Sequence, residues 1–472
     1  MTFALCAPER CETIRGMPER PPGRPPGPPL PPFLQTLGFL TAGTGFLRAA
    51  HRRYGDVVWF RTLFDPGFAM VFEPGLVRQV FQAPPDRLRA GEANAPLSMV
   101  LGPRSVLVLD GAEHIRHRRL MLPPFHGKRL AVHERVMAEA ADRTIDSWPV
   151  GGEFALLRTM YVLTLDVIAT AVFGIEEDER REELKRRIRT FLETASRPLR
   201  VILLMLSRGR MRDDQGMRRF EERKRAMDEL ILEEIARRRG EPDLEERDDA
   251  LSLLLLARDE DGTGLTDAEV RDELVTLLVA GHETTAAGLA WTLELVHRDP
   301  RVLARSREAA ATGDTDYLDA AVKESLRIRP VVPGIGRVVR GGPFEIGGYS
   351  IPEGVEINPS IRTIHRRSDS FPQPGEFRPE RFLGEDVPDT YTWIPFGGGT
   401  RRCLGASFAQ LEMRVVLSRV LQRAEMAPAG RRPERAVRRG VTMVPRQGAR
   451  VVQVRPPLPA GAAPAPRVTV AA

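Results

Sequence analysis

Cysteine is scarce in this chain, because Cys6, Cys11 and Cys403 are the only three among 472 residues. Three cysteines do not make a disulfide framework, and a reducing compartment is the usual setting for such a sequence. The N-terminal region also lacks the apolar run of about 20 residues that crosses a bilayer, and it has no apolar segment of the signal-peptide kind. We therefore expect a soluble, cytoplasmic protein without a membrane anchor.

Lysine is also rare, since only four of the 70 basic residues are lysines. The 64 acidic residues nearly balance the basic ones and alternate with them, as in residues 176–189. Alternating charge is typical of solvated helix faces and differs from the basic stripe of a nucleic-acid-binding protein. No nucleic acid is expected among the partners.

Glycine and proline, by contrast, are abundant, with 41 and 40 residues. The Pro-rich stretch 18–32 predicts an extended lead-in, and the Pro/Ala-rich end of the chain predicts disorder. No linker is evident in between. We expect a flexible segment 1–32, one large domain 33–455 and a disordered tail 456–472.

Cys403 lies in a run rich in glycine and arginine, with the spacing F-x-x-G-x-R-x-C-x-G. Thiolates bind metals, and nearby positive charge lowers the pKa of a thiol. The residues after this run predict a helix, which would place Cys403 near a helix N-terminus that favours an anion. The alternative is a glycine-rich turn around a buried structural cysteine, but the spacing favours a metal-bound thiolate. The spaced positions are Phe396, Gly399, Arg401, Cys403 and Gly405.

This pattern resembles the haem-ligand loop of the cytochrome P-450 family. The resemblance runs from about residue 33 to 455 and implies a mainly α fold with small β-sheets in a single large haem-binding domain. It also implies haem b with Cys403 as the axial thiolate and the only protein ligand to iron. Phe396, Gly399, Arg401 and Gly405 would surround the cofactor.

The stretch 110–120 predicts a helix on which His114 and Arg118 share one face, because they are four residues apart. An exposed basic helix is the alternative. Beside a haem loop, the pair resembles the family's H-x-x-x-R helix, whose donors bind the haem propionates. The resemblance gives Arg337 and Arg401 the same role at the haem edge.

The run 272–291 predicts a long apolar helix that a glycine and an acid–alcohol pair interrupt. Gly281 would leave room for a small ligand, and the Thr284 hydroxyl can bond the Ala280 carbonyl and distort the helix locally. Glu283 and Thr284 could relay protons for O2 activation. The alternative is a kinked helix with a satisfied threonine. The run resembles the family motif A-G-x-[DE]-T-[TS], which places Ala280 and Gly281 beside the haem.

Further positions resemble the family's scaffold and pocket. Glu324 and Arg327 are three apart on a helix, and with Arg381 of a later loop they would form a buried network that supports the Cys loop. Residues 153–240 predict several helices, and the apolar run 161–175 predicts a buried one. The resemblance implies that helices of this region, which includes the apolar run 201–206, form a lid over the substrate, and an ordinary core helix is the alternative. The expected substrate pocket is lined by Leu277, Val331, Val332, Ile335 and Met443.

The expected activity is a monooxygenase that inserts one oxygen atom from O2 into an apolar fatty acid, terpenoid or steroid. No reductase segment follows the Cys loop, so we expect a separate electron donor, a ferredoxin with its reductase, docked near Arg116, Arg119 and Arg414. Two alternatives remain: a haem-thiolate peroxygenase or isomerase that takes no electrons, and a non-catalytic haem sensor. The Glu283–Thr284 pair argues against both, because a proton relay serves reductive O2 activation.

Overall fold

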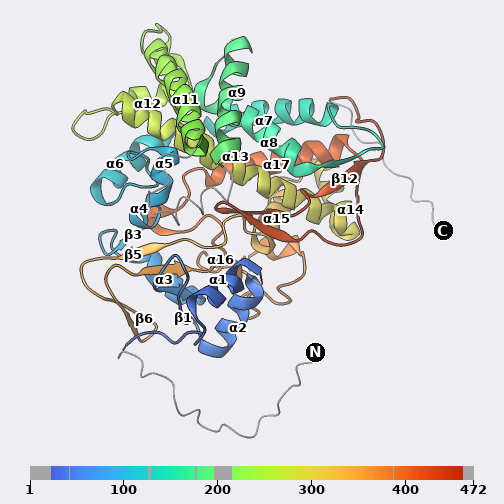
Figure 1. Ribbon diagram of the computed structural model, residues 1–472. Coiled ribbons are helices and arrows are strands. Elements are labelled where there is room, and N and C mark those ends of the chain that lie inside the picture. The colour runs from blue at the N-terminus through green and yellow to red at the C-terminus, as the bar shows by residue number, and fades with distance from the viewer. Residues whose placement is uncertain are drawn as a thin grey trace, which may run out of the picture.

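The computed structural model describes residues 23–41, 43–125, 129–175, 178–195, 215–385 and 387–460. Helices dominate, and Figure 1 shows them gathered around the long helix α13, with the main sheet and the N-terminal helices at the lower end of the view. The expected mainly α fold is confirmed. The helices are α1 (Pro32–Thr41), α2 (Thr44–Tyr54), α3 (Pro74–Gln82), α4 (Ala90–Ala93), α5 (Ser98–Leu101), α6 (Gly111–Met121), α7 (Arg129–Asp146), α8 (Leu156–Phe173), α9 (Asp178–Ala195), α11 (Gln215–Arg239), α12 (Ala250–Leu256), α13 (Asp267–Arg298), α14 (Pro300–Thr312), α15 (Thr315–Ile328), α16 (Ile361–Ile364) and α17 (Ala406–Arg423), with short 3-10 turns such as η4 (Pro379–Phe382) and η5 (Gly399–Arg401).

The largest sheet has the strand order β1-β2-β8-β5-β3. β1 and β2 form an antiparallel hairpin, whereas β8 joins β2 in parallel. Its strands are β1 (Val57–Phe60), β2 (Phe68–Val71), β3 (Leu88–Arg89), β5 (Arg337–Val339) and β8 (Glu356–Pro359). The smaller sheets pair β4 (Glu153–Ala155) and β9 (Met426–Pro428) with β12 (Arg450–Gln453), β6 (Phe344–Ile346) with β7 (Tyr349–Ile351), and β10 (Ala436–Arg439) with β11 (Thr442–Pro445).

Helix α13 forms the axis of the core. It begins with a capping box in which the Thr266 N–H donates to the Glu269 carboxylate (2.7 Å) and the Glu269 N–H donates to the Thr266 hydroxyl (3.3 Å). These bonds satisfy donors that a helix start leaves free. The helix then runs unbroken to Arg298, although the sequence predicted a local distortion near Gly281.

Helix α8 packs against α13. It is the one described helix that is long and apolar enough to cross a membrane, but 67% of it is buried inside the protein. Ile168 lies under Gly281, and the buried Thr164 hydroxyl donates to the His282 carbonyl (3.1 Å). These contacts identify α8 as a core helix.

The Pro-rich lead-in differs from the flexible segment expected for residues 1–32. Within its described part, Pro25, Pro26 and Pro28 are buried, and the Trp59 N–H donates to the Pro26 carbonyl (2.8 Å). The backbone of Gly27 lies so close to Trp59 that a Cβ would meet its carbonyl oxygen at 1.9 Å. Proline spacing alone could not show this, because the contact is made to a strand about 30 residues further along the chain.

The far end of the domain also continues past the expected boundary at 455. Arg423 of α17 donates through Nε to the Leu458 carbonyl (2.8 Å), and the Leu458 N–H donates back to Arg423 (2.9 Å). Residues 461–472 of the expected tail, residues 1–22 of the lead-in and the apolar run 201–206 lie outside the described residues.

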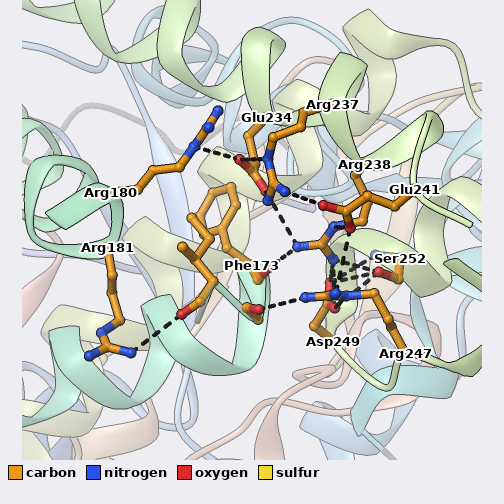
Figure 2. A network of polar contacts seen from close by, with 12 residues as sticks. Phe173, Arg180, Arg181, Glu234, Arg237, Arg238, Glu241, Arg247, Asp249 and Ser252 are labelled. Atoms are coloured by element: carbon orange, nitrogen blue, oxygen red, sulfur yellow. Dashed lines mark hydrogen bonds and ion pairs between the residues drawn. The ribbon is translucent and has the colours of Figure 1, made fainter. Parts of the chain in front are cut away.

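A buried network of charges fixes the C-terminal end of α11 (Figure 2). The fully buried Arg238 donates to both oxygens of Asp249 (2.7 and 2.6 Å), to the Phe173 carbonyl that ends α8 (2.6 Å), and to Ser252 of α12 (2.6 Å). Arg247 reaches the neighbouring Gly174 carbonyl (2.8 Å). Arg238 thereby ties α11 to α12 and to the end of α8, which lies 65 residues earlier in the sequence.

Candidate functional site

The loop that carries Cys403 is closed by its own backbone. The Cys403 N–H donates to the Phe396 carbonyl (3.0 Å), and the Gly397 N–H donates to the Ile394 carbonyl (3.0 Å). Gly397 and Gly399 have φ of 67° and 65°, in the left-handed region that side chains with a Cβ rarely adopt. The glycines therefore set the path of the loop.

The same glycines let the loop pack against α3. A Cβ on Gly398 would lie 2.2 Å from the Phe81 ring, and a Cβ on Gly399 would lie 2.1 Å from the Phe81 carbonyl oxygen. Gly405 is different, because its φ is −86° and a Cβ there would meet no described atom within 4 Å. Backbone conformation and protein packing explain Gly397, Gly398 and Gly399 but not Gly405.

Cys403 exposes surface, yet protein atoms crowd around it closely enough for burial to raise the pKa of its thiol. The Gly405 N–H and the charges of Arg118 and Arg402 act in the opposite direction and favour the thiolate. The Cys403 side chain therefore faces inward: part of its surface is accessible, but it lies within a crowded part of the protein.

The network expected to support this loop is present, with Glu324 and Arg327 fully buried and Arg381 partly buried. Glu324 accepts from Arg327 Nε (2.6 Å) and Nη2 (2.8 Å), and more weakly from Arg381 Nε (3.3 Å). Arg327 also donates to the carbonyls of His365 (2.8 Å) and Pro374 (3.0 Å). The three residues come from α15 and η4, so the network joins a helix to the segment that leads into the Cys loop.

His365 completes the connection, and sequence reasoning missed it. It is fully buried and accepts the Ile394 N–H through Nε2 (2.9 Å), while Nδ1 lies 3.2 Å from the Arg327 carbonyl. These partners require the tautomer protonated at Nδ1. Burial and the charge of Arg327 lower the pKa of His365 to about 3, which keeps the ring neutral. No local pattern marks this residue, because both partners are distant in the sequence.

Four cationic or ionisable side chains expected at a haem edge converge in the structure. His114 is buried, its Nδ1 has no hydrogen-bond partner, and burial together with Arg401, Arg118 and Arg337 lowers its pKa to about 3. Arg337 is buried, and desolvation followed by the charge of Arg401 lowers its pKa to about 10. Arg118 makes no hydrogen bond to a described residue. Such a group of mutually repelling donors is suited to binding carboxylates.

Arg401 has a second set of partners that the sequence did not suggest. Its guanidinium donates to the Val106 carbonyl (3.1 Å), to the Leu109 carbonyl and to the Asp110 carboxylate (2.5 Å). Asp110 also accepts the N–H groups of Gly91 and Glu92, at 2.9 Å each. Arg401 therefore clamps the segment before α6 to the Cys loop. His114, Arg118 and Arg337 have fewer partners within the protein and are the donors more available to a carboxylate.

The central turn of α13 presents the acid–alcohol pair at a partly accessible position. The Thr284 hydroxyl donates to the Ala280 carbonyl (2.6 Å), as the sequence predicted. Ala280 is exposed, and Glu283 and Thr284 are partly so, although residues 285–294 of the same helix are buried. α17, which starts three residues after Cys403, packs on α13 one turn later, where Met413 contacts Gly288. The pair and the Cys loop thus belong to one region.

Gly281 lies where α13 packs closely against α8. A Cβ on it would point at Ile168 Cδ1 of α8, 3.0 Å away. The missing side chain lets the two helices approach closely.

The expected pocket residues come from separate segments. The Met443 N–H donates to the Val331 carbonyl (2.7 Å), and the buried Trp291 of α13 donates to the Met443 carbonyl (3.0 Å). Leu277 and Val332 keep partial exposure. Val331 and Met443 are brought together as predicted, with Trp291 as the residue that fixes them.

The arginines expected to dock an electron donor are all paired. Arg116 binds Asp259 (2.6 Å), Arg119 binds Glu260 (2.5 Å), and Arg414 lies 3.5 Å from Asp319. Neutralised arginines offer little net attraction, so the charge argument for a docking face at these three residues fails.

A second buried pair, also missed from the sequence, links α6 to α13. His117 Nδ1 lies 2.7 Å from Glu273, which also accepts the Val106 N–H (2.9 Å). Burial raises the pKa of Glu273 to about 7, and the neighbouring carboxylates Glu273 and Glu269 raise the pKa of His117 against its own desolvation. The pair holds α6, which carries His114 and Arg118, against α13, which carries Thr284.

These observations fit a haem. A cofactor with an iron and two carboxylates would require three features that are present here. They are an inward-facing cysteine, an unpartnered His114 nitrogen among arginines, and a glycine at 405 that the contacts within the protein do not explain. These residues therefore suit a haem, because they supply donors and positive charge for its carboxylates and a backbone that it can approach closely.

Comparison with known proteins agrees. The model of the cytochrome P-450 family matches residues 25–451. A Mycobacterium tuberculosis chain named cytochrome P-450 135B1 is 42% identical over 427 residues, covering 89% of each chain, and one named cytochrome P-450 137 is 38% identical, covering 88% of this chain and 86% of its own. A cytochrome P-450DA haem domain superposes with a TM-score of 0.79 at 25% identity, covering 92% of this chain and 98% of that one. A retinoic-acid-bound cyanobacterial CYP120A1 gives 0.77 at 24%, covering 91% and 98%, which shows the fold alone.

Proposed function

The chain belongs to the cytochrome P-450 family and is a haem monooxygenase, and on this premise we propose that Cys403 is the axial ligand and that the substrate is an apolar small molecule of the fatty acid, terpenoid or steroid class. Electrons would come from a separate donor, a ferredoxin with its reductase. The reaction would take place in the cytoplasm. When bound, haem supplies the redox chemistry of O2 activation.

The observation that carries the assignment is the inward-facing thiol of Cys403 with the Gly405 N–H and two guanidinium groups around it. The loop that carries Cys403 and Gly405 is supported by the buried Glu324–Arg327–His365 connection. His114, Arg118 and Arg337 would hold the two carboxylates of the cofactor.

Glu283 and Thr284 would govern proton delivery. Thr284 is held by its bond to the Ala280 carbonyl, which orients the hydroxyl oxygen toward the accessible side of α13. Glu283 and Tyr161 interact electrostatically, since the carboxylate contributes to the raised pKa of the Tyr161 phenol. An acid next to an oriented hydroxyl is a suitable path for protons from solvent. Val331, Val332, Leu277 and Met443 would supply the apolar contact to substrate.

Replacement of the ligand tests the first part. Cys403→Ser should abolish the ferrous–CO absorption band typical of thiolate ligation, while Cys6→Ser and Cys11→Ser should retain it. A Cys403→Ser protein that keeps the band would refute the assignment.

Replacement of the hydroxyl tests the second part. Thr284→Ala should keep substrate affinity and reductant consumption, but form less product and release more hydrogen peroxide, because a general-acid path is worth about 10²–10⁴-fold. Thr285→Ala, at the buried neighbour, serves as the matched control. Equal coupling of reductant to product in Thr284→Ala and the parent would contradict the relay. Turnover of the parent with peroxide alone, and none with O2 and reductant, would instead favour a peroxygenase.

A further inference from the structure

Four arginines from separate segments of the chain lie close together, apart from the haem-edge donors. Arg48 lies on α2, Arg329 directly follows α15, and Arg362 and Arg366 lie on and just after α16. Helix α2 packs against α16, and Arg366 Nη2 donates to the Ile328 carbonyl at the end of α15 (3.2 Å). Figure 1 shows α16 between α15 and α2. We refer to these four residues as the arginine cluster.

The guanidinium groups of the cluster repel one another. Burial, followed by the charges of Arg329 and Arg48, lowers the pKa of Arg362 to about 10. Burial, followed by the charge of Arg329, has the same effect on Arg366, whose pKa is also lowered to about 10. Like charges in a half-buried position raise the free energy of the folded protein unless an anion neutralises them.

The cluster also keeps hydrogen-bond donors that the protein does not use. No member forms an ion pair within the described part of the chain, and the side chains of Arg48 and Arg362 make no hydrogen bond to a described residue. The buried Nε of Arg329 has no partner, although its Nη2 donates to the Glu434 carbonyl (3.3 Å). The Arg329 guanidinium lies over the Trp291 ring, 4.9 Å from its centroid, which fixes its position. Buried donors are normally paired, so these free groups call for a partner.

The nearest carboxylates do not supply that partner. Glu294 and Glu434 act against the desolvation of Arg329, yet the pKa of Arg329 stays below its ordinary value. Glu294 is already paired with Arg298, and the Glu434 carboxylate accepts two backbone N–H groups (3.2 and 3.1 Å). Neither carboxylate acts on the pKa of Arg362. The positive charge of the cluster is therefore left without a counter-charge.

We infer that the arginine cluster is a binding site for a phosphate group, either as the free ion or as part of a small phosphate ester. The planar fork of a guanidinium matches the oxygens of a phosphate and can donate two hydrogen bonds to them. A carboxylate would neutralise only one of the four charges, whereas a phosphate brings up to two negative charges and more acceptor oxygens. The haem carboxylates do not account for the cluster, because the donors expected to hold them belong to α6, β5 and the Cys loop.

The test uses the haem-loaded full chain with inorganic phosphate as the probe and sodium chloride at the same ionic strength as the comparison. Phosphate should bind in calorimetric titration and raise the midpoint of thermal unfolding by at least about 1 °C at about 10 mM, because it binds only the folded chain. Sodium chloride should give a smaller rise, since it only screens the charges. Phenyl phosphate distinguishes the two sources: binding at least as tight as that of phosphate indicates an ester, and exclusion indicates the free ion.

Replacement of one cluster member locates the site. Arg362→Gln should weaken phosphate binding at least about tenfold, because a charge-assisted pair of hydrogen bonds is lost. Without phosphate the same variant should unfold at or above the temperature of the parent, since one of the repelling charges is gone. An arginine with a merely structural role would lower that temperature. Arg48→Gln, at the exposed member, gives a second measurement and should also weaken binding.

The matched control is Arg52→Gln with Arg53→Gln, two exposed arginines of α2 outside the cluster. It should bind phosphate as the parent does. Haem content and an absorption spectrum that phosphate does not change show that each variant is folded and that the ion does not act at the haem. Absence of phosphate binding by the parent, equal binding by the parent and Arg362→Gln, or an equal stabilisation by sodium chloride would overturn the inference.

Discussion

Two buried charge networks stabilise this protein, and they differ in how they are built. The Glu324–Arg327 pair lies three residues apart on α15, with both side chains fully buried. Arg238 lies on α11 and pairs with Asp249, which caps the start of α12. Arg238 also reaches the end of α8 (Figure 2). The first network supports the Cys loop, whereas the second joins helices that carry no proposed catalytic residue. Similar burial therefore serves cofactor binding in one place and helix assembly in the other.

The largest effect should come from Glu324→Ala. Removal of the carboxylate leaves Arg327 buried without its charge partner, which costs about 3–5 kcal/mol. Little haem-loaded protein should form, because His365 and the Cys loop depend on the same arginine. Haem per polypeptide and urea unfolding measure the outcome. Glu380→Ala, an exposed carboxylate of η4 paired with Arg301, is the control and should keep full haem. A stable, fully loaded Glu324→Ala protein would remove the distinction between the networks.

Arg238→Met should destabilise the fold by about 3 kcal/mol, since it leaves Asp249 buried without its main partner. The absorption spectrum of the protein that folds should be unchanged, because this network does not touch the Cys loop. Arg239→Met, the exposed neighbour that pairs with Asp267, should change little. If Arg238→Met alters the haem spectrum as strongly as Glu324→Ala does, the two networks are coupled.

His365→Leu should cost about 1–3 kcal/mol, because the Ile394 N–H loses its acceptor inside the protein. Its absorption spectrum should also change, since Ile394 leads into the Cys loop. Trp393→Phe is a useful comparison, because it removes the bond from Trp393 to the Lys323 carbonyl (3.1 Å) and keeps an aromatic ring next to Phe382 and Phe396. An unchanged spectrum in His365→Leu would limit His365 to a packing role.

His365 also predicts a dependence on pH. Its pKa is lowered to about 3 in the folded protein, against 6.5 for an ordinary histidine, so the unfolded chain binds more protons between these values. The free energy of unfolding should therefore fall as pH drops below about 6.5, by up to about 1.4 kcal/mol per pH unit for this one group. His365→Leu should show a shallower fall. Equal slopes in variant and parent would contradict the assignment of a neutral ring.

The smallest effect should come from Arg119→Ala. Its partner Glu260 is mostly exposed, and pairs of that kind contribute about 0.2–1 kcal/mol. Chemical denaturation should place the variant within that range of the parent. A loss as large as that of Arg238→Met would mean that burial does not control the strength of these networks.

The sequence by itself determined the features that depend on local spacing. The loop around Cys403, the Thr284–Ala280 bond, the Glu324–Arg327 pair and the β1–β2 hairpin each follow from residues within a few positions of one another, where one helical turn or one reverse turn fixes the geometry. The chain's overall class followed from the same motifs taken in order.

Only the tertiary structure decided the contacts between distant segments. It showed His365 between α15 and the Cys loop, the Arg401–Asp110 clamp, the link from Arg238 to the end of α8, and Gly281 as a point of contact between α8 and α13. It also packed the proline segment onto β1 and brought the four members of the arginine cluster together. Such contacts depend on which surfaces meet when the whole chain folds, and spacing along the sequence carries no information about that.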